Sequence, residues 1–192
     1  MNSQTHIIMG AALFGKAMPR HAMAGALGGI IPDLPMYGII AALRMSGYPL
    51  SEIFGRIYWE HWWQVANAIG HSFLLWGALL AISLALRNMP WRGAAIALSG
   101  SALLHSAIDF LCHRDDGHMH FWPLTEWRFR SPISYWDPNY FGREFSFFEA
   151  ALGVVLVVVL WRRYTRWHVR LPLLAALAAY IAVPAYFIFG NA

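Results

Sequence analysis

Six histidine and aspartate side chains, distributed over four apolar segments of this 192-residue chain, are of types that bind metal ions. They are His6, Asp33, His71, His105, Asp109 and His113. An ionisable group inside an apolar membrane segment is costly and usually marks a functional site or a buried pair. Imidazole nitrogens and carboxylate oxygens are the donor atoms that Zn²⁺ and similar divalent ions take. The residue types therefore predict a divalent-metal site, with zinc as the expected ion.

The spacing of these residues predicts that they converge. His105, Asp109 and His113 follow one another at intervals of four residues, so they form one stripe on a helix. The other three side chains fall at a similar depth in three other apolar segments. Four helices are therefore expected to meet at one site.

A polar run after the last of these segments supplies further groups that could transfer protons. It extends from His113 to His120, and Asp115, Asp116 and His118 are its candidate acid and base residues. A hydroxide-like nucleophile generated at a metal ion needs such a partner to take up or return a proton. We expect these three residues to lie at the mouth of the site.

Several of the polar residues also have less specific interpretations. A single histidine near a helix end is more often a hydrogen-bonded interfacial residue than a ligand, and His21, His61 and His168 are interpreted in this way. Asp33 lies between two prolines and could simply cap the helix that follows. Cys112, the single cysteine, could be a ligand, but its position at a helix end is more typical of packing.

The composition indicates that these residues sit in a membrane protein. The chain is 58% hydrophobic and 12% charged, with ten tryptophans. A soluble domain averages about 25% charged residues, and tryptophan is enriched at membrane interfaces. The net charge of +4 comes from basic residues scattered among apolar segments, which argues against nucleic-acid binding. Membrane lipid is the expected surrounding partner.

Six apolar segments predict an all-α, polytopic bundle that forms a single membrane-embedded domain over residues 1–192. The segments are Thr5 to Met18, His21 to Leu43, Ala66 to Leu86, Trp91 to Cys112, Phe145 to Trp161 and Leu171 to Phe189. About 20 residues are needed to cross the hydrocarbon core, so the first segment is short. The runs do not alternate as barrel strands do, and open sheets cannot cross lipid. About six transmembrane helices are expected.

The charges predict how the bundle is oriented. Three connections are short, whereas residues 44–65 and 113–144 form two long ones. Eight of the fourteen basic residues belong to the short connections: Lys16, Arg20, Arg87, Arg92, Arg162, Arg163, Arg166 and Arg170. Basic residues in short loops mark the cytoplasmic side. Both termini and both long connections are therefore predicted to be non-cytoplasmic, and the metal site is predicted to face that side.

Four short motifs, together with the stretch that follows them, resemble a known family. They are Thr5-His6, Gly29-Ile30-Ile31-Pro32-Asp33, Gly70-His71-Ser72 and His105-Ser106-Ala107-Ile108-Asp109, followed by His120 to Leu124 and Ser131 to Pro138. In order and spacing they resemble the membrane-bound metal-dependent hydrolases, a group that includes LexA-binding inner-membrane proteins. The chain departs from the family pattern at Pro35, where a second aspartate is often found.

The resemblance implies a bacterial inner-membrane protein whose histidines and aspartates bind a metal ion and assist hydrolysis. On this basis the expected ligands are His6, Asp33, His71, His105 and Asp109. The predicted function is hydrolysis of a lipid or lipid-linked ester or phosphoester at the outer leaflet.

Two other functions remain open. One is a non-catalytic membrane subunit or scaffold with a structural metal or a plain polar network. The other is a haem protein in which His71 and His105 are the axial ligands.

Overall fold

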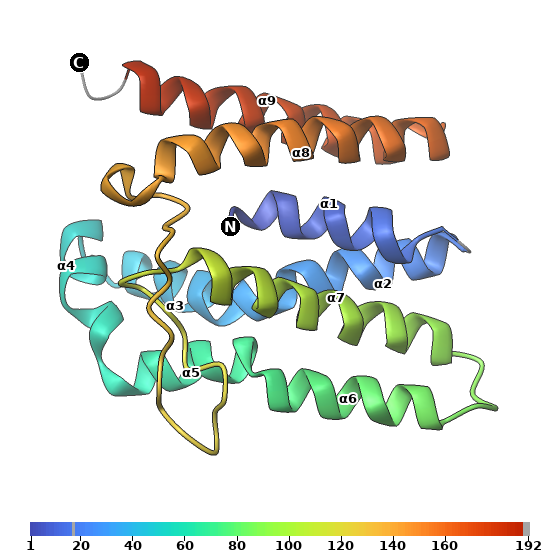
Figure 1. Ribbon diagram of the computed structural model, residues 1–192, viewed down its shortest axis with the longest axis horizontal. Coiled ribbons are helices and arrows are strands. Elements are labelled where there is room, and N and C mark those ends of the chain that lie inside the picture. Colours follow the sequence, from blue (N-terminus) through green and yellow to red (C-terminus); the bar gives the residue numbers. More distant parts are fainter. Residues whose placement is uncertain (17, 190–192) are drawn as a thin grey trace.

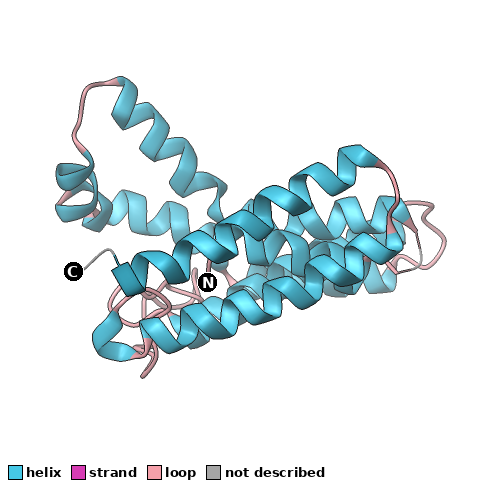
Figure 2. Cartoon of the chain, turned by 90° about the horizontal axis from the view of Figure 1, so that it is seen from above, coloured by secondary structure: helices cyan, strands magenta, loops and turns pink. Residues whose placement is uncertain are grey.

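Helices are the regular elements throughout residues 1–16 and 18–189, the part of the chain that this computed structural model describes. Figures 1 and 2 show elongated helices lying side by side, joined by loops, with no strand in the described residues. The predicted all-α membrane bundle is therefore confirmed.

Four stretches of helix are long and apolar enough to cross a membrane. The first combines α2 (Pro19–Ile30), a 3-10 turn (Ile31–Asp33) and α3 (Leu34–Met45), and the second combines α5 (His61–His71) and α6 (Phe73–Ala85). The others are α7 (Arg92–Cys112) and α8 (Gly142–Arg163). The remaining α-helices are α1 (Ser3–Phe14), α4 (Leu50–Gly55) and α9 (Trp167–Phe189), which is apolar over Trp167–Ala182.

Each of the six predicted segments is helical, and the predicted shortness of the first is also observed. Helix α1 has 12 residues, which corresponds to a length of about 18 Å at 1.5 Å per residue. The hydrocarbon core is about 30 Å thick, so α1 cannot cross it unaided. Its neighbours shield it instead, because α1 packs on α2, α7, α8 and α9.

The connections divide between the two ends of the bundle as their lengths predict. Figure 1 shows the α1–α2, α6–α7 and α8–α9 connections at one end and the long connections at the other. The basic short connections thus share one face of the protein. Which face meets the cytoplasm remains a prediction from the charges, and the C-terminus itself falls in residues 190–192, outside the described residues.

Reporter fusions test this orientation. A reporter that works only in the cytoplasm should be active when inserted after Asn88, in the basic α6–α7 connection, and silent when inserted after Glu126, in the long connection. The second insertion is the matched control for the first because both sites lie in loops. A signal after Glu126 and none after Asn88 would reverse the proposed orientation.

Two helix interruptions aim side chains toward the centre of the bundle. Pro32 lacks a backbone N–H, and here the helix tightens into the 3-10 turn that contains Asp33. Between α5 and α6, Ser72 is extended, and its hydroxyl accepts a hydrogen bond from the Leu75 amide at 3.2 Å. The long connection docks on this break, because the Phe73 amide donates to the His120 carbonyl at 2.8 Å.

Glycines bring three helices into backbone contact. A Cβ atom at Gly10 would overlap the Gly25 carbonyl, and one at Gly29 would overlap the His6 carbonyl, so α1 and α2 touch through their main chains. A Cβ at Gly28 would likewise overlap the Leu98 carbonyl of α7. Small residues allow this close approach in membranes, where packing drives helix association.

Candidate metal centre

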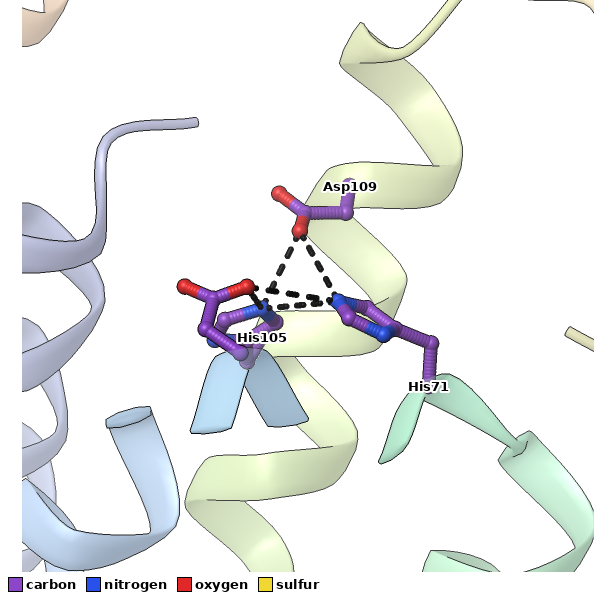
Figure 3. Close-up of side chains that lie close together, drawn as sticks. His71, His105 and Asp109 are labelled. Atoms are coloured by element: carbon purple, nitrogen blue, oxygen red, sulfur yellow. Dashed lines mark hydrogen bonds and ion pairs between the residues drawn. The ribbon is translucent and has the colours of Figure 1, made fainter. Parts of the chain in front are cut away.

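Four buried side chains from three helical segments direct one donor atom each at a common point. The atoms are Asp33 Oδ1, His71 Nε2, His105 Nε2 and Asp109 Oδ2, and all four donors lie within 4.8 Å of one another. His105 Nε2 is 3.0 Å from Asp109 Oδ2 and 3.2 Å from His71 Nε2. Asp33 Oδ1 lies 3.5–3.6 Å from the Nε2 atoms of both histidines, and His71 Nε2 lies 3.5 Å from Asp109 Oδ2. Figure 3 shows His71, His105 and Asp109 pointing toward one another. Ligands of one zinc ion are separated by about 3–4 Å.

The protein fixes the other ring nitrogen of each histidine. Nδ1 of His71 lies 2.9 Å from the Asn67 carbonyl, and Nδ1 of His105 lies 2.8 Å from the Gly29 carbonyl. A carbonyl oxygen can only accept a hydrogen bond, so Nδ1 carries the proton in both rings. A neutral ring then directs the lone pair of Nε2 at the centre, which is the arrangement found around metal-ligating histidines.

The free oxygen of Asp33 is held in a similar way. Oδ2 accepts a hydrogen bond from the Ser3 hydroxyl, which lies 2.7 Å from the Tyr37 hydroxyl. Asp33 makes no capping hydrogen bond to α3, so the capping interpretation is wrong. Its carboxylate instead turns Oδ1 into the bundle.

His6 lies beside these four donors and not among them. Its Nε2 is 3.0 Å from Asp109 Oδ1, the oxygen that faces away from the other three ligands, and its ring stacks on His105 with centroids 3.6 Å apart. The sequence placed His6 in the same ligand set as the other four residues. The structure separates it from them because α1 approaches Asp109 from the opposite side.

The donor set fits a divalent cation. Two lone-pair nitrogens and two carboxylate oxygens converge inside the bundle, and acceptor atoms this close are stable only around positive charge. That charge is either a bound cation or protons on the imidazoles. Two nitrogen and two oxygen donors at these separations match a divalent ion such as Zn²⁺. Hydrogen bonds to Nδ1 of both histidines and to Oδ2 of Asp33 hold three of the four donor groups in place.

The haem alternative is wrong for this geometry. Axial histidines lie on opposite faces of a macrocycle, whereas His71 Nε2 and His105 Nε2 are 3.2 Å apart. Asp109 Oδ2 lies within 3.5 Å of both nitrogens. The space between the rings therefore holds a carboxylate oxygen and leaves no room for a porphyrin.

A cavity of about 490 Å³ reaches the centre from the end of the bundle that carries the long connections. Asp33, His71 and Asp109 line its inner part, and His113, Asp116 and His118 line another part of its wall. Four exposed aromatic side chains also line it: Tyr37, Phe54, Trp59 and Trp136. Phe121, Trp122 and Pro123, which could have plugged such an entrance, are not part of the lining.

The three predicted acid and base residues have different surroundings. Asp115 is exposed, pairs with Arg130 at 2.6 Å and does not line the cavity. Burial favours a raised pKa for Asp116, but hydrogen bonds from His113 and Trp136 outweigh it and lower that pKa. Burial, reinforced by neighbouring histidines, lowers the pKa of His118 well below its usual value. His118 is therefore neutral at physiological pH, and Asp116 is ionised.

One buried carboxylate near the site was not singled out from the sequence. Glu149 of α8 is 2% exposed and accepts hydrogen bonds from the Asn2 amide at 2.9 Å and the Thr5 hydroxyl at 2.6 Å. The Tyr180 hydroxyl of α9 donates to the same threonine at 2.8 Å. This network ties the start of α1 to α8 and α9. A glutamate inside the apolar segment from Phe145 to Trp161 was the available signal.

Comparison with known proteins agrees with a membrane assignment. No curated protein and no solved structure matches the chain. The sequence model of one family, described as the YdjM inner membrane protein, matches residues 1–188. That match covers nearly the whole chain, and the four candidate spans agree with a multi-pass protein. The chain therefore belongs to the YdjM inner membrane protein family.

Proposed function

We propose that this protein is a membrane-bound, divalent-metal-dependent hydrolase that acts at the non-cytoplasmic surface. The observation that carries the proposal is the convergence of Asp33, His71, His105 and Asp109 at one end of a cavity that is open to the protein's surroundings. A buried cluster without a cavity would hold an ion but could not admit a substrate. Zinc is the proposed ion because nitrogen and oxygen donors in a four-ligand set suit it.

A bound divalent ion would supply Lewis acidity and lower the pKa of a water molecule toward neutrality. The protein's own residues do the remaining work. His71 and His105 keep their rings oriented through Nδ1, and Ser3 orients Asp33. His118 lines the cavity as a neutral imidazole whose buried Nδ1 has no hydrogen-bond partner, so it is placed to accept a proton from a group in the cavity.

The lining of the cavity favours a lipid or lipid-linked substrate. Tyr37, Trp59 and Trp136 are 44–48% exposed at its rim, on the part of the bundle where the long connections lie. Tyrosine and tryptophan gather where a membrane meets water. An ester or phosphoester held at headgroup depth would meet this rim while its acyl chains stayed in the bilayer.

One observation favours the non-catalytic alternative. A structural zinc site is closed by four protein ligands, whereas a catalytic site usually has three and an open position. The four convergent donors fit the closed type if they all bind the same ion. A scaffold with a structural metal is therefore the second candidate function.

Metal analysis of wild type and of a variant that lacks one metal-binding side chain tests the hydrolase and the scaffold functions. Detergent-purified wild type should contain a divalent metal and hydrolyse fluorogenic lipid esters or phosphoesters, and a chelator should abolish the hydrolysis. His105→Ala should lose metal and activity but remain folded in the membrane, because helix packing holds the bundle. His61→Ala is the matched control, since His61 is exposed and pairs only with Glu126.

Three outcomes count against the hydrolase. A wild-type protein free of divalent metal removes the metal site. Metal without turnover of any lipid ester or phosphoester, together with a His105→Ala variant that unfolds, indicates a structural ion. Equal metal and activity in wild type and His105→Ala would show that the cluster is not the site.

A further inference from the structure

Asp109 has a second oxygen that faces a separate group of donors. Oδ2 points to the centre described above, whereas Oδ1 lies 3.6 Å from His113 Nε2 and 3.9 Å from Cys112 Sγ. Asp109, Cys112 and His113 are all buried, and one donor atom from each lies within 4.8 Å of the others. Carboxylate, thiolate and imidazole are the usual zinc-ligand types.

His113 is oriented as a metal-ligating histidine would be. Its Nδ1 lies 3.0 Å from Asp116 Oδ2, and the Trp136 indole N–H donates to the same oxygen at 3.0 Å. Nε2 is therefore the nitrogen turned toward Asp109. A carboxylate close behind an imidazole raises the basicity of the ring toward a metal. Asp116 thus supports His113, whereas the sequence suggested it as a proton shuttle.

A positively charged amino group lies beside Asp109 Oδ1 and Cys112 Sγ. The amino nitrogen of Met1 lies 2.7 Å from Asp109 Oδ1 and 3.2 Å from Cys112 Sγ. His6 Nε2 also lies 3.0 Å from Oδ1. The oxygen and the sulfur are thus close enough to share a cation, and a bound ion would take the place that the amino group now fills.

We propose that Asp109, Cys112 and His113 bind a second divalent ion, most suitably Zn²⁺, and that Asp109 bridges the two ions through its two oxygens. The inference rests on the proposed function and extends it. Cys112 would bind as the thiolate and release its proton to solvent. Two-metal hydrolytic sites hold their ions about 3.5–4 Å apart, a separation that one carboxylate can bridge.

This second position would be the one that faces the substrate. It has three protein ligands, which leaves a place open, and His113 lines the cavity. The first centre has four protein ligands and matches a closed site. A bridged pair therefore reconciles a closed centre with an accessible cavity, because the two properties belong to different ions.

Metal stoichiometry in the purified protein tests the proposal. Wild type kept reduced and loaded with Zn²⁺ should contain two ions per chain, whereas Cys112→Ala and His113→Ala should each contain one. His105→Ala should also lose one ion. His61→Ala, which changes an exposed histidine of the long connection, should keep both.

Cobalt provides a readout that does not depend on activity or on counting ions. Co²⁺-loaded wild type should show a thiolate-to-metal charge-transfer band, because Cys112 is the single cysteine. The band should be absent in Cys112→Ser and present in His105→Ala. Circular dichroism of both variants should match wild type, so that loss of the band reports the ligand.

The outcomes separate this inference from the proposed function. One ion per chain, unchanged in Cys112→Ala and without a thiolate band, overturns the second ion and leaves the first centre intact. No ion in any preparation overturns both. Two ions with no thiolate band in wild type would place the second ion elsewhere and also overturn the assignment.

Discussion

Asp109→Asn is expected to remove nearly all bound divalent metal and to lower hydrolysis by at least about 10³-fold, since a catalytic metal supplies several kcal/mol of stabilisation. The substitution keeps the shape of the side chain. It removes the negative charge that both donor groups share, and the amide nitrogen cannot coordinate. Its two oxygens face both sets of donors, His71 and His105 on one oxygen and Cys112 and His113 on the other.

Elemental analysis and the lipid-hydrolysis assay measure this effect. Asp115→Asn is the matched control, because Asp115 is exposed on the neighbouring loop and pairs only with arginines. An exposed ion pair contributes at most about 1 kcal/mol, so this variant should retain metal and activity. An Asp109→Asn protein that kept its metal would refute the central role of that carboxylate.

Gly29→Ala should destabilise the fold strongly. The new methyl group would overlap the His6 carbonyl oxygen, and it also approaches the Ile7 backbone, so neither neighbour is a flexible side chain that could move aside. Overpacking typically costs about 1–3 kcal/mol even where side chains can adjust, and here two helices must separate. The separation would also carry the Gly29 carbonyl away from His105.

Gly38→Ala is the control for this variant. Gly38 lies in α3, in the same predicted span, and a Cβ atom there meets nothing within 4 Å. Its thermal unfolding and metal content should match wild type, whereas Gly29→Ala should unfold at a lower temperature and bind less metal. Equal unfolding temperatures for the two variants would contradict the tight α1–α2 contact.

The periodicity of the sequence was enough to predict which residues approach the centre. His105 and Asp109 are four residues apart on one helix, so their shared face follows from helix geometry alone. The depth of Asp33 and His71 along their segments placed them at the same level.

The division of the donors between the two oxygens of Asp109 could not be predicted. It depends on the direction from which α1 reaches α7, and that direction is set by backbone contacts that the sequence of neither helix encodes by itself. His6, which was predicted to join the other four ligands, lies on the Oδ1 side of Asp109. Cys112 was interpreted as a packing residue because its proximity to the carboxylate appears only after the helices are assembled.

The glycine contacts have a consequence for which ions can bind. His71 follows Gly70, where a Cβ atom would overlap the Pro32 carbonyl, and Asp33 follows that proline. The two ligands are thus carried on main chains that touch, so the separation of their backbones is fixed and only side-chain rotation can adjust the donor atoms. The choice of ion would then follow from the donors themselves: two imidazole nitrogens and two carboxylate oxygens suit an ion such as Zn²⁺, whereas Ca²⁺ takes six to eight oxygen ligands.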